Sequence, residues 1–246
     1  MMKQVFKRTE GLKDKEFSYC GGCLHSLVHR IIAELLEELG LLDKTIGICP
    51  VGCAVFMYDF INTDMIEAAH GRAPAVATGV KRCNPDKFVF TYQGDGDLAS
   101  IGMAEIIHAA ARGENYSAIF INNGIYGMTG GQMAPTTLVE QKATTCQLGR
   151  NPEFHGMPIK VCEMLATLDE PVYLTRVAPI NPAGVIATKK AIKTAFENQI
   201  NGKGFSLVEI LANCPTQWGV TPVESIKWIE EKVKPVYPTG VIKVKE

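Results

Sequence analysis

The sequence has no strong excess of either charge, no long apolar run and no apolar leader. Its 25 lysines and arginines nearly balance 26 aspartates and glutamates, which gives a formal net charge of −1. A chain without a basic excess does not attract nucleic-acid phosphates, so we expect no nucleic-acid partner. No stretch approaches the roughly 20 apolar residues that cross a bilayer, so we expect no membrane span. Residues 1–16 lack the apolar core of a secretory signal, which predicts a cytoplasmic protein.

No internal repeat, low-complexity tract or clear linker divides the chain. With 246 residues, of which 46% are hydrophobic and 21% charged, the composition is that of an ordinary globular protein. The simplest division is a single domain over residues 1–246 with a C-terminal extension. The tail from Lys234 contains prolines, and we expect it to lie on another surface.

Segments of helix and strand character alternate along the sequence. Residues 24–39 place their apolar side chains on one helical face and end at Gly40, whereas residues 88–92 form a short apolar run typical of a buried strand. The predicted strands are 45–49, 88–92, 117–121, 172–177 and 205–211, and the predicted helices are 24–39, 73–80, 99–112, 184–200 and 222–233. This alternation predicts an α/β fold with a doubly wound parallel sheet.

Two oxygen-bearing turns follow neighbouring predicted strands. Gly94-Asp95-Gly96-Asp97 comes after one strand, and Asn122-Asn123 comes after the next. Ligands of open parallel sheets collect at the carboxyl ends of the strands, and glycines let the backbone approach a ligand closely. The side-chain oxygens therefore suit Mg²⁺ carrying a diphosphate, while the same residues are also common in plain turns. The loop 123–135 has almost no charge, which favours a binding loop.

Eight cysteines need an explanation in a chain that we expect to stay reduced. Cys20 and Cys23 form a C-x-x-C pair ahead of a predicted helix, Cys53 follows a strand end, and Cys214 follows the last predicted strand. One edge of an α/β sheet could gather these thiolates. The pattern alone fits zinc, a redox disulfide or an iron–sulfur cluster, and the lone cysteines elsewhere are expected in the core.

Five motifs occur in a fixed order along the chain. They are Y-C-G-G-C-L-H, P-V-G-C, A-A-H-G-R-A-P-A-V-A-T-G-V-K, Y-Q-G-D-G-D-L-A and N-N-G-I-Y-G-M-T-G-G-Q-M-A-P-T-T. Together they resemble the β subunits of the 2-oxoacid:ferredoxin oxidoreductases, and the likeness runs from Tyr19 to the region of Trp228. The resemblance implies the thiamine-diphosphate-binding fold, with thiamine diphosphate, Mg²⁺ and one [4Fe–4S] cluster as cofactors.

The resemblance also implies metal ligands, residue by residue. The Mg²⁺ ligands would be the side chains of Asp95 and Asn123 and the carbonyl of Ile125. The cluster ligands would be Cys20, Cys23, Cys53 and Cys214. Two positions depart from the family pattern. Gly21 stands where proline is usual, and Cys49 is an extra thiol that leaves the third cluster ligand open between Cys49 and Cys53.

The same likeness implies which residues meet thiamine diphosphate and the substrate. The set comprises Gly52, Cys53, His70, Gly94, Gly96, Asp97, Tyr126, Gly127, Met128 and Thr129. On the residues alone, His70 could also be a histidine bonded to local backbone. Neither Glu67 nor Glu105 matches the glutamate that activates the aminopyrimidine ring, and no catalytic residue is assigned in this chain. We therefore expect a partner α subunit to supply that glutamate, and this chain alone to be inactive.

The implied reaction is oxidative decarboxylation of a 2-oxoacid to acyl-coenzyme A and carbon dioxide, with electrons passing through the cluster to ferredoxin. The implied partners are the α subunit, further γ and δ subunits, ferredoxin, coenzyme A and the 2-oxoacid. Gly130 stands where relatives that use pyruvate or 2-oxoglutarate often carry lysine, and Met128 and Met133 add apolar surface. This favours a branched-chain 2-oxoacid such as 3-methyl-2-oxobutanoate, with 2-oxoglutarate as the next choice.

Two other functions stay open at the level of sequence. A thiamine enzyme without a cluster would leave the four cysteines unexplained. A non-catalytic Cys₄ scaffold, binding zinc or a cluster, would leave Asp95 and Asn123 unexplained. The three hypotheses differ in whether the protein binds thiamine diphosphate, iron or zinc.

Overall fold

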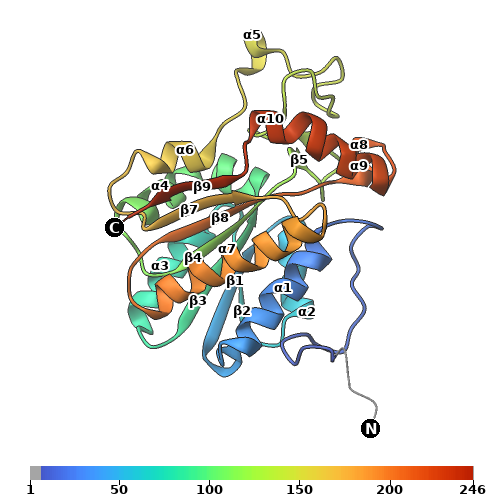
Figure 1. Ribbon diagram of the computed structural model, residues 1–246. Coiled ribbons are helices and arrows are strands. Elements are labelled where there is room, and N and C mark those ends of the chain that lie inside the picture. Colours follow the sequence, from blue (N-terminus) through green and yellow to red (C-terminus); the bar gives the residue numbers. More distant parts are fainter. Residues whose placement is uncertain (1–6, 246) are drawn as a thin grey trace.

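Seven strands form one sheet in the computed structural model, which describes residues 7–245. The spatial order is β2-β1-β3-β4-β8-β7-β9, and every neighbouring pair is parallel except β7 and β9 (Figure 1). The bounds are β1 Thr45–Pro50, β2 Asp64–Ala68, β3 Phe88–Gly94, β4 Ser117–Asn122, β7 Tyr173–Val177, β8 Ser206–Leu211 and β9 Gly240–Val244. The predicted α/β fold with a doubly wound parallel sheet is confirmed.

Helices cover both faces of the sheet. Within β3, Phe88 and Phe90 pack on one face while Val89 packs on the other, because side chains alternate along a strand. The first face is covered by α1 (His25–Glu38) and α7 (Pro182–Ile200), and the second by α3 (Ala73–Cys83), α4 (Met103–Ala111) and α6 (Val161–Ala166). Burial on both faces explains why the central strands are continuous apolar runs.

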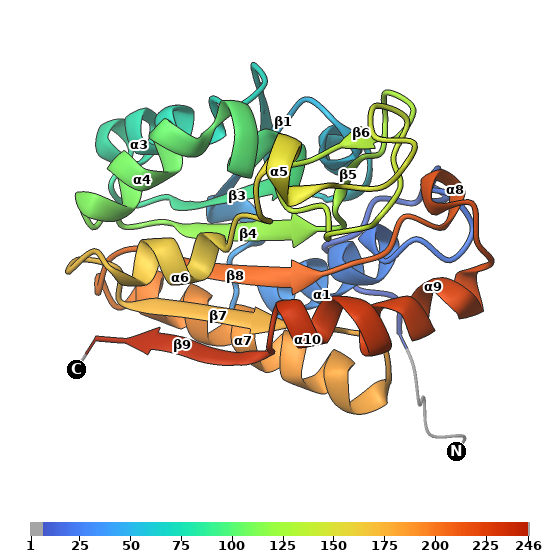
Figure 2. The ribbon, with the colours of Figure 1, turned by 90° about the horizontal axis from the view of Figure 1, so that it is seen from above.

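The short elements gather mainly beyond the carboxyl ends of the parallel strands. Figure 2 shows the parallel strands pointing toward the side where β5, β6 and α8 lie, with β9 running the opposite way. The short elements of the described chain are β5 Ile125–Tyr126, β6 Gln132–Met133, α2 Met57–Phe60, α5 Pro152–His155, α8 Pro215–Trp218, α9 Pro222–Trp228, α10 Lys234–Val236, and the turns η1 Leu42–Lys44, η2 Cys53–Phe56, η3 Asp97–Ile101 and η4 Ile229–Val233.

No helix in the described part of the chain is both long and apolar enough to cross a membrane.

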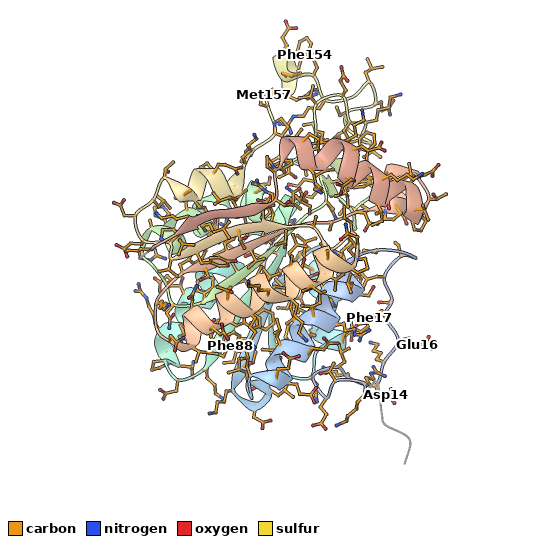
Figure 3. All side chains as sticks on the ribbon, in the orientation of Figure 1. Asp14, Glu16, Phe17, Phe88, Phe154 and Met157 are labelled. Carbon is orange, nitrogen blue, oxygen red and sulfur yellow. The ribbon has the colours of Figure 1, made fainter. Side chains whose placement is uncertain are left out.

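The segment 137–158 projects from the body of the molecule (Figure 1). Phe154 and Met157 lie at its outer end (Figure 3), with 76% and 65% of their surfaces exposed. Its base is held by the buried guanidinium of Arg150, which donates to the carbonyls of Pro135 and Thr137 at 2.8 and 2.7 Å. The projection is therefore anchored to the loop that follows the predicted cofactor segment.

The helix predicted at 99–112 is interrupted. The chain makes a π-helical turn, η3, and α4 begins only after Gly102, whose amide donates to the Asp97 carbonyl at 2.8 Å. A Cβ at Gly102 would lie 2.8 Å from the carbonyl oxygen of Gly71, so the segment after β2 packs directly on this turn. Close packing between backbones, which helical periodicity does not encode, explains the interruption.

The prediction for the tail was wrong. Residues after Lys234 do not lie on another surface: β9 extends the sheet, pairing antiparallel with β7 from Tyr173 with Val244 to Arg176 with Gly240. Ile242 of this strand packs against the core on the α3–α4–α6 face. The edge strand β2 was also missed, because its sequence Asp-Met-Ile-Glu-Ala is short and partly exposed.

Candidate functional site

The strand order brings four predicted site residues to one edge of the sheet. Cys53 follows β1, Asp95 follows β3, Asn123 follows β4 and Cys214 follows β8. These strands are neighbours in the order β1-β3-β4-β8, and the register pairs Gly94 with Ile121 and Asn122 with Leu211. The oxygen donors and two of the thiols therefore lie side by side.

Asp95 lies at the centre of this edge and is almost completely buried. Its Oδ1 accepts from the Gly96 amide at 2.8 Å, and its Oδ2 accepts from the Gly124 amide at 2.5 Å and the Thr136 hydroxyl at 2.6 Å. Burial raises the pKa of Asp95 to about 6, although these hydrogen bonds favour the charged form. A carboxylate fixed in this way is a ready oxygen ligand whose charge a cation would stabilise.

The Asn122-Asn123-Gly124 turn is held from several directions. The Oδ1 of Asn123 accepts from the Ile125 amide at 3.2 Å, and the Thr137 hydroxyl donates to the Gly124 carbonyl at 2.6 Å. Behind the turn, the Nδ2 of Asn122 donates to the buried Glu209 carboxylate at 2.7 Å. Asp95, Asn123 and Ile125 all border the same cavity, so a hard cation with oxygen ligands fits this side.

The cavity at this edge is lined by every residue that the resemblance assigns to the cofactor. Its wall consists of His25, Val51, Gly52, Cys53, Ala54, His70, Gly94, Asp95, Gly96, Asp97, Asn123, Ile125, Tyr126, Gly127, Met128 and Thr129. Gly52 has φ +116°, a backbone conformation that other residues rarely adopt. A Cβ at Gly96 would lie 2.4 Å from the Tyr126 ring, so this ring rests directly on the Gly96 backbone. The described wall contains no lysine, arginine or glutamate.

His70 is oriented by a carboxylate and not by local backbone alone. Its Nδ1 lies 2.6 Å from Oδ1 of Asp97, which also accepts from the Gly71 amide at 2.5 Å. The other oxygen of Asp97 accepts from Gln93 Nε2 at 2.7 Å. Asp97 therefore uses its carboxylate within the protein, and its contribution to the cavity is to hold His70 at the wall.

The cysteines predicted to bind a metal group lie near this cavity, two of them directly at its wall. A Cβ at Gly127 would lie 3.4 Å from the sulfur of Cys214 and 3.5 Å from that of Cys53. Burial, followed by the thiols of Cys214, Cys53 and Cys20, raises the pKa of Cys23 to about 12. Burial, followed by Cys53 and Cys20, raises the pKa of Cys214 to about 11, and burial and Cys20 also raise that of Cys53. Every pair within this quartet (Cys20, Cys23, Cys53 and Cys214) is thus close enough to interact electrostatically.

Cys49 is not part of the quartet. Within residues 7–245, no three histidine, cysteine, aspartate or glutamate side chains converge closely enough to hold a single metal ion. The thiol of Cys49 is buried and donates to the Val55 carbonyl at 3.5 Å, and its pKa is raised to about 11 by burial and by Glu67. The thiol of Cys49 is therefore held within the core.

Several residues that hold the quartet were missed from the sequence. Asn213 accepts from the Leu24 amide at 3.1 Å and donates to the Gly22 carbonyl at 3.0 Å, tying the Cys20–Cys23 turn to the end of β8. Tyr19 donates to the Cys53 carbonyl at 2.9 Å and stacks on His25 with ring centroids 4.9 Å apart. An asparagine beside a cysteine was the only local signal for the first contact, and nothing local signals the second.

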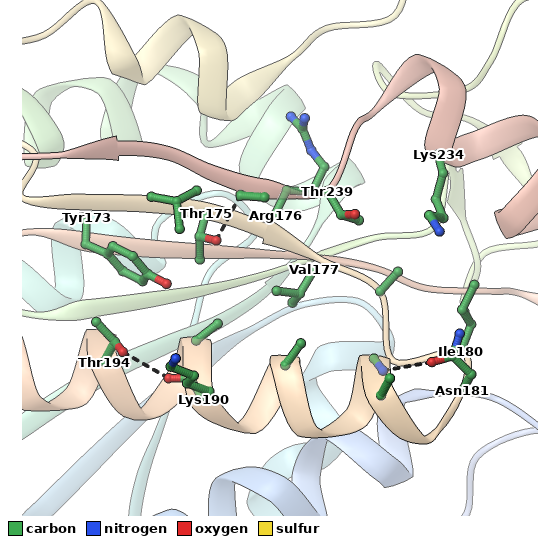
Figure 4. Close-up of a pocket in the computed structure, with 17 residues that line it drawn as sticks. Tyr173, Thr175, Arg176, Val177, Ile180, Asn181, Lys190, Thr194, Lys234 and Thr239 are labelled. Atoms are coloured by element: carbon green, nitrogen blue, oxygen red, sulfur yellow. Dashed lines mark hydrogen bonds between the residues drawn. The ribbon is translucent and has the colours of Figure 1, made fainter.

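A separate cavity of about 500 Å³ lies between β7, β9 and α7 (Figure 4). Alanine, threonine and valine dominate its wall, with Lys190 and Lys234 at its sides. None of the predicted site residues lines it. The chemistry-bearing residues belong to the edge described above.

Comparison with known proteins agrees with this geometry. Residues 50–210 match the family described as thiamine pyrophosphate enzyme, C-terminal TPP binding domain. A 2-oxoglutarate synthase subunit KorB from Methanocaldococcus jannaschii is 34% identical, over 87% of this chain and 77% of that protein. This chain belongs to the thiamine-pyrophosphate-binding subunits of the 2-oxoacid oxidoreductases.

Other members of this family of subunits differ in length. Ketoisovalerate oxidoreductase subunit VorA from Methanothermobacter thermautotrophicus is 44% identical over 96% of this chain, but this chain spans only 50% of that subunit. A solved 2-oxoglutarate:ferredoxin oxidoreductase from Magnetococcus marinus, with 2-oxoglutarate, coenzyme A and succinyl-CoA bound, matches 99% of this chain and 86% of that one. The TM-score is 0.79 and the sequence identity 25%. Thiamine diphosphate binding is therefore the shared property of this oxidoreductase subunit family and the fold.

Proposed function

We propose that this chain is the thiamine-diphosphate-binding β subunit of a 2-oxoacid:ferredoxin oxidoreductase in the cytoplasm, where thiols stay reduced. The reaction is oxidative decarboxylation of a 2-oxoacid to acyl-coenzyme A and carbon dioxide, with electrons delivered to ferredoxin. The observation that carries the proposal is the meeting of two donor sets at Gly127. The oxygen donors and Cys53 line the same cavity, and the sulfurs of Cys53 and Cys214 lie against Gly127 of its wall.

Mg²⁺ would be held by the side chains of Asp95 and Asn123 and by the carbonyl of Ile125. Their support is the buried carboxylate of Asp95, the adjoining turn and the all-oxygen chemistry of the set. The described cavity wall offers no lysine or arginine to neutralise a diphosphate. Binding of the diphosphate would therefore depend on the metal, on backbone amides and on His70.

A [4Fe–4S] cluster would be held by Cys20, Cys23, Cys53 and Cys214. The electrostatic interaction of all four thiols with one another supports one shared metal group, and an all-cysteine ligand set is typical of a [4Fe–4S] cluster. We assign the third position to Cys53, since Cys49 donates its thiol to a backbone carbonyl inside the core.

When bound, thiamine diphosphate supplies an electron sink for decarboxylation and the cluster accepts single electrons. This chain binds and orients these groups. Gly52, Gly94 and Gly96 let the backbone approach the cofactor, and the Asp97 carboxylate holds the His70 ring at the cavity wall. Tyr126, Gly127, Met128 and Thr129 would form the surface between cofactor and substrate.

The active site would be completed by another chain. No glutamate lines the described cavity, so the glutamate that activates thiamine diphosphate would come from a partner α subunit. Further γ and δ subunits, coenzyme A and ferredoxin would join the assembly. We retain a single domain over residues 1–246 as part of this proposal.

We propose 3-methyl-2-oxobutanoate as the preferred 2-oxoacid, with 2-oxoglutarate and pyruvate as alternatives. Met128 contributes apolar surface to the cavity wall, and Gly130 carries no cation for a second carboxylate. The 44% identity to a ketoisovalerate oxidoreductase subunit, against 34% to a 2-oxoglutarate synthase subunit, points the same way.

The test is a substrate screen on the protein co-purified anaerobically with its partner subunits, following ferredoxin reduction. We expect the branched 2-oxoacid to give the highest kcat/KM. Higher kcat/KM with 2-oxoglutarate would overturn the substrate assignment. Full activity of this chain without any partner would overturn the shared active site.

A further inference from the structure

Two series of hydrogen bonds connect the C-terminal segment to the proposed metal ligands. Tyr237, just after α10, is completely buried, and its hydroxyl lies 3.0 Å from the carbonyl oxygen of Thr136 and 3.2 Å from that of Ile159. The side chain of Thr136 in turn donates to Asp95. The Tyr237 hydroxyl is therefore linked to a proposed Mg²⁺ ligand, Asp95, through one intervening residue, Thr136.

The second series of hydrogen bonds runs through a buried ion pair. Arg176 of β7 donates from Nε to Glu209 of β8 at 2.8 Å, and both side chains are fully buried. The other oxygen of Glu209 accepts from Asn122, the neighbour of Asn123. Arg176 also donates to the Pro238 carbonyl at 3.2 Å and lies 5.2 Å from the centroid of the Tyr237 ring. The two series of hydrogen bonds thus meet at residues 237–238.

A buried ion pair contributes little net stability, because removing both charges from water offsets their attraction. Net stability is therefore a weak explanation for the pair. Arg176 also donates two hydrogen bonds to Glu163 of α6, at 2.8 and 2.6 Å. The Tyr237 hydroxyl and the Glu209 carboxylate, by contrast, bond residues next to the proposed metal ligands. The antiparallel pairing of β9 with β7 fixes the residues immediately after Pro238, so the anchor itself is rigid.

Building on the proposed function, we propose that Tyr237, together with the Arg176–Glu209 pair, is a positioning residue for the Mg²⁺–diphosphate site. Tyr237 fixes Thr136 against Asp95, and Glu209 fixes Asn122 beside Asn123. The segment after α10 thereby sets the distance between the two metal ligands, and the tail is part of the cofactor site.

The consequence is selectivity between cations. Mg²⁺ requires near-ideal octahedral geometry at about 2.0–2.1 Å, whereas Ca²⁺ accepts irregular geometry at about 2.3–2.6 Å. Loosening the two turns should weaken Mg²⁺ binding more than Ca²⁺ binding. A general loss of folding stability would weaken both equally.

The experiment compares Tyr237→Phe with Tyr116→Phe in the complex with its partner subunits. Tyr116 is equally buried, but its hydroxyl has no hydrogen-bond partner, so its loss is a matched control. Calorimetric titration with Mg²⁺ or Ca²⁺ at saturating thiamine diphosphate measures each Kd. For Tyr237→Phe we expect the Kd of Mg²⁺ to rise about three- to tenfold, the value of one hydrogen bond, with that of Ca²⁺ changed less than about twofold.

Glu209→Gln provides a second variant, which keeps the shape of the side chain and removes its charge. It should lower the same Mg²⁺-to-Ca²⁺ preference. The positioning role is overturned if Tyr237→Phe matches Tyr116→Phe, or if both cations weaken by the same factor. Failure of the wild-type complex to bind thiamine diphosphate with either cation would instead overturn the proposed function.

Discussion

The two sides of the site are built in different ways. The oxygen side comes from residues directly after β3 and β4, and each Asp95 oxygen already accepts hydrogen bonds from the protein. The sulfur side comes from Cys20 and Cys23 before α1, Cys53 after β1 and Cys214 after β8. Cys20 is exposed and the other three cysteines are partly buried, and burial raises the pKa of Cys23 to about 12 and that of Cys214 to about 11.

This difference indicates which side of the site depends on its cofactor for its shape. The oxygen side is fixed by adjacent strands and should keep its shape without metal. The sulfur side gathers four groups whose ionised forms repel one another, so it is stabilised as thiolate only by a positively charged metal group. We therefore expect the two sides to be lost independently on mutation.

The largest effect is expected for Cys214→Ser. Replacing one cluster ligand should reduce iron from about four atoms per chain to near none, because hydroxyl is a poor iron ligand. Thiamine diphosphate affinity should change less than about threefold, because Cys214 does not line the cofactor cavity. Iron analysis and calorimetry measure both, with the exposed Cys83→Ser as control. A full cluster in Cys214→Ser would disprove the ligand set.

The corresponding substitution on the oxygen side is Asp95→Ala. It removes a metal ligand and the acceptor for two amides and a hydroxyl, so thiamine diphosphate affinity should fall by about 100-fold or more. The iron content should stay at that of the wild type. Asp86→Ala, which removes an exposed carboxylate, is the control for both measurements. Loss of iron together with thiamine diphosphate would show that the two sides are not independent.

Acid should affect the oxygen side first. Because burial raises the pKa of Asp95 to about 6, its carboxylate becomes protonated as the pH falls through 6, and the proton then competes with Mg²⁺. We expect metal-dependent thiamine diphosphate binding to weaken by up to about tenfold per pH unit below 6 and to be constant from 7 to 8. Calorimetry over this range, corrected for titration of the free cofactor, checks the sign. Tighter binding at pH 5 than at pH 7 would contradict it.

The smallest effect is expected for Cys49→Ser, which sharpens the choice of third ligand. Cys49 lies in β1, shortly before Cys53, and its buried thiol donates to the Val55 carbonyl. A hydroxyl there should lower the free energy of unfolding by about 1 kcal/mol and leave the iron content unchanged. Cys53→Ser should lose the iron, as Cys214→Ser does. If Cys49→Ser lost the iron and Cys53→Ser kept it, the assignment would be reversed.

The sequence was sufficient for five of the seven strands of the sheet, β1, β3, β4, β7 and β8. The central strands were predictable because runs such as residues 88–92 are buried on both faces, and the strand ends then located Asp95 and Asn123. The supporting contacts were not predictable. Asn213 bonds Leu24 across 189 residues, and Asn122 bonds Glu209 across 87, so neither partner signals the other locally. The tail strand β9 was missed because its pairing depends on the exposed edge of β7.

The central claim is that one chain holds a thiamine diphosphate–Mg²⁺ site and a four-iron cluster side by side. Its most direct test is an ultraviolet–visible spectrum with iron, sulfide, zinc and thiamine assays on anaerobically purified protein, co-expressed with its partners. The account predicts a brown protein with about four iron and four sulfide per chain and stoichiometric thiamine diphosphate. Thiamine diphosphate without iron, or zinc without thiamine diphosphate, would contradict it.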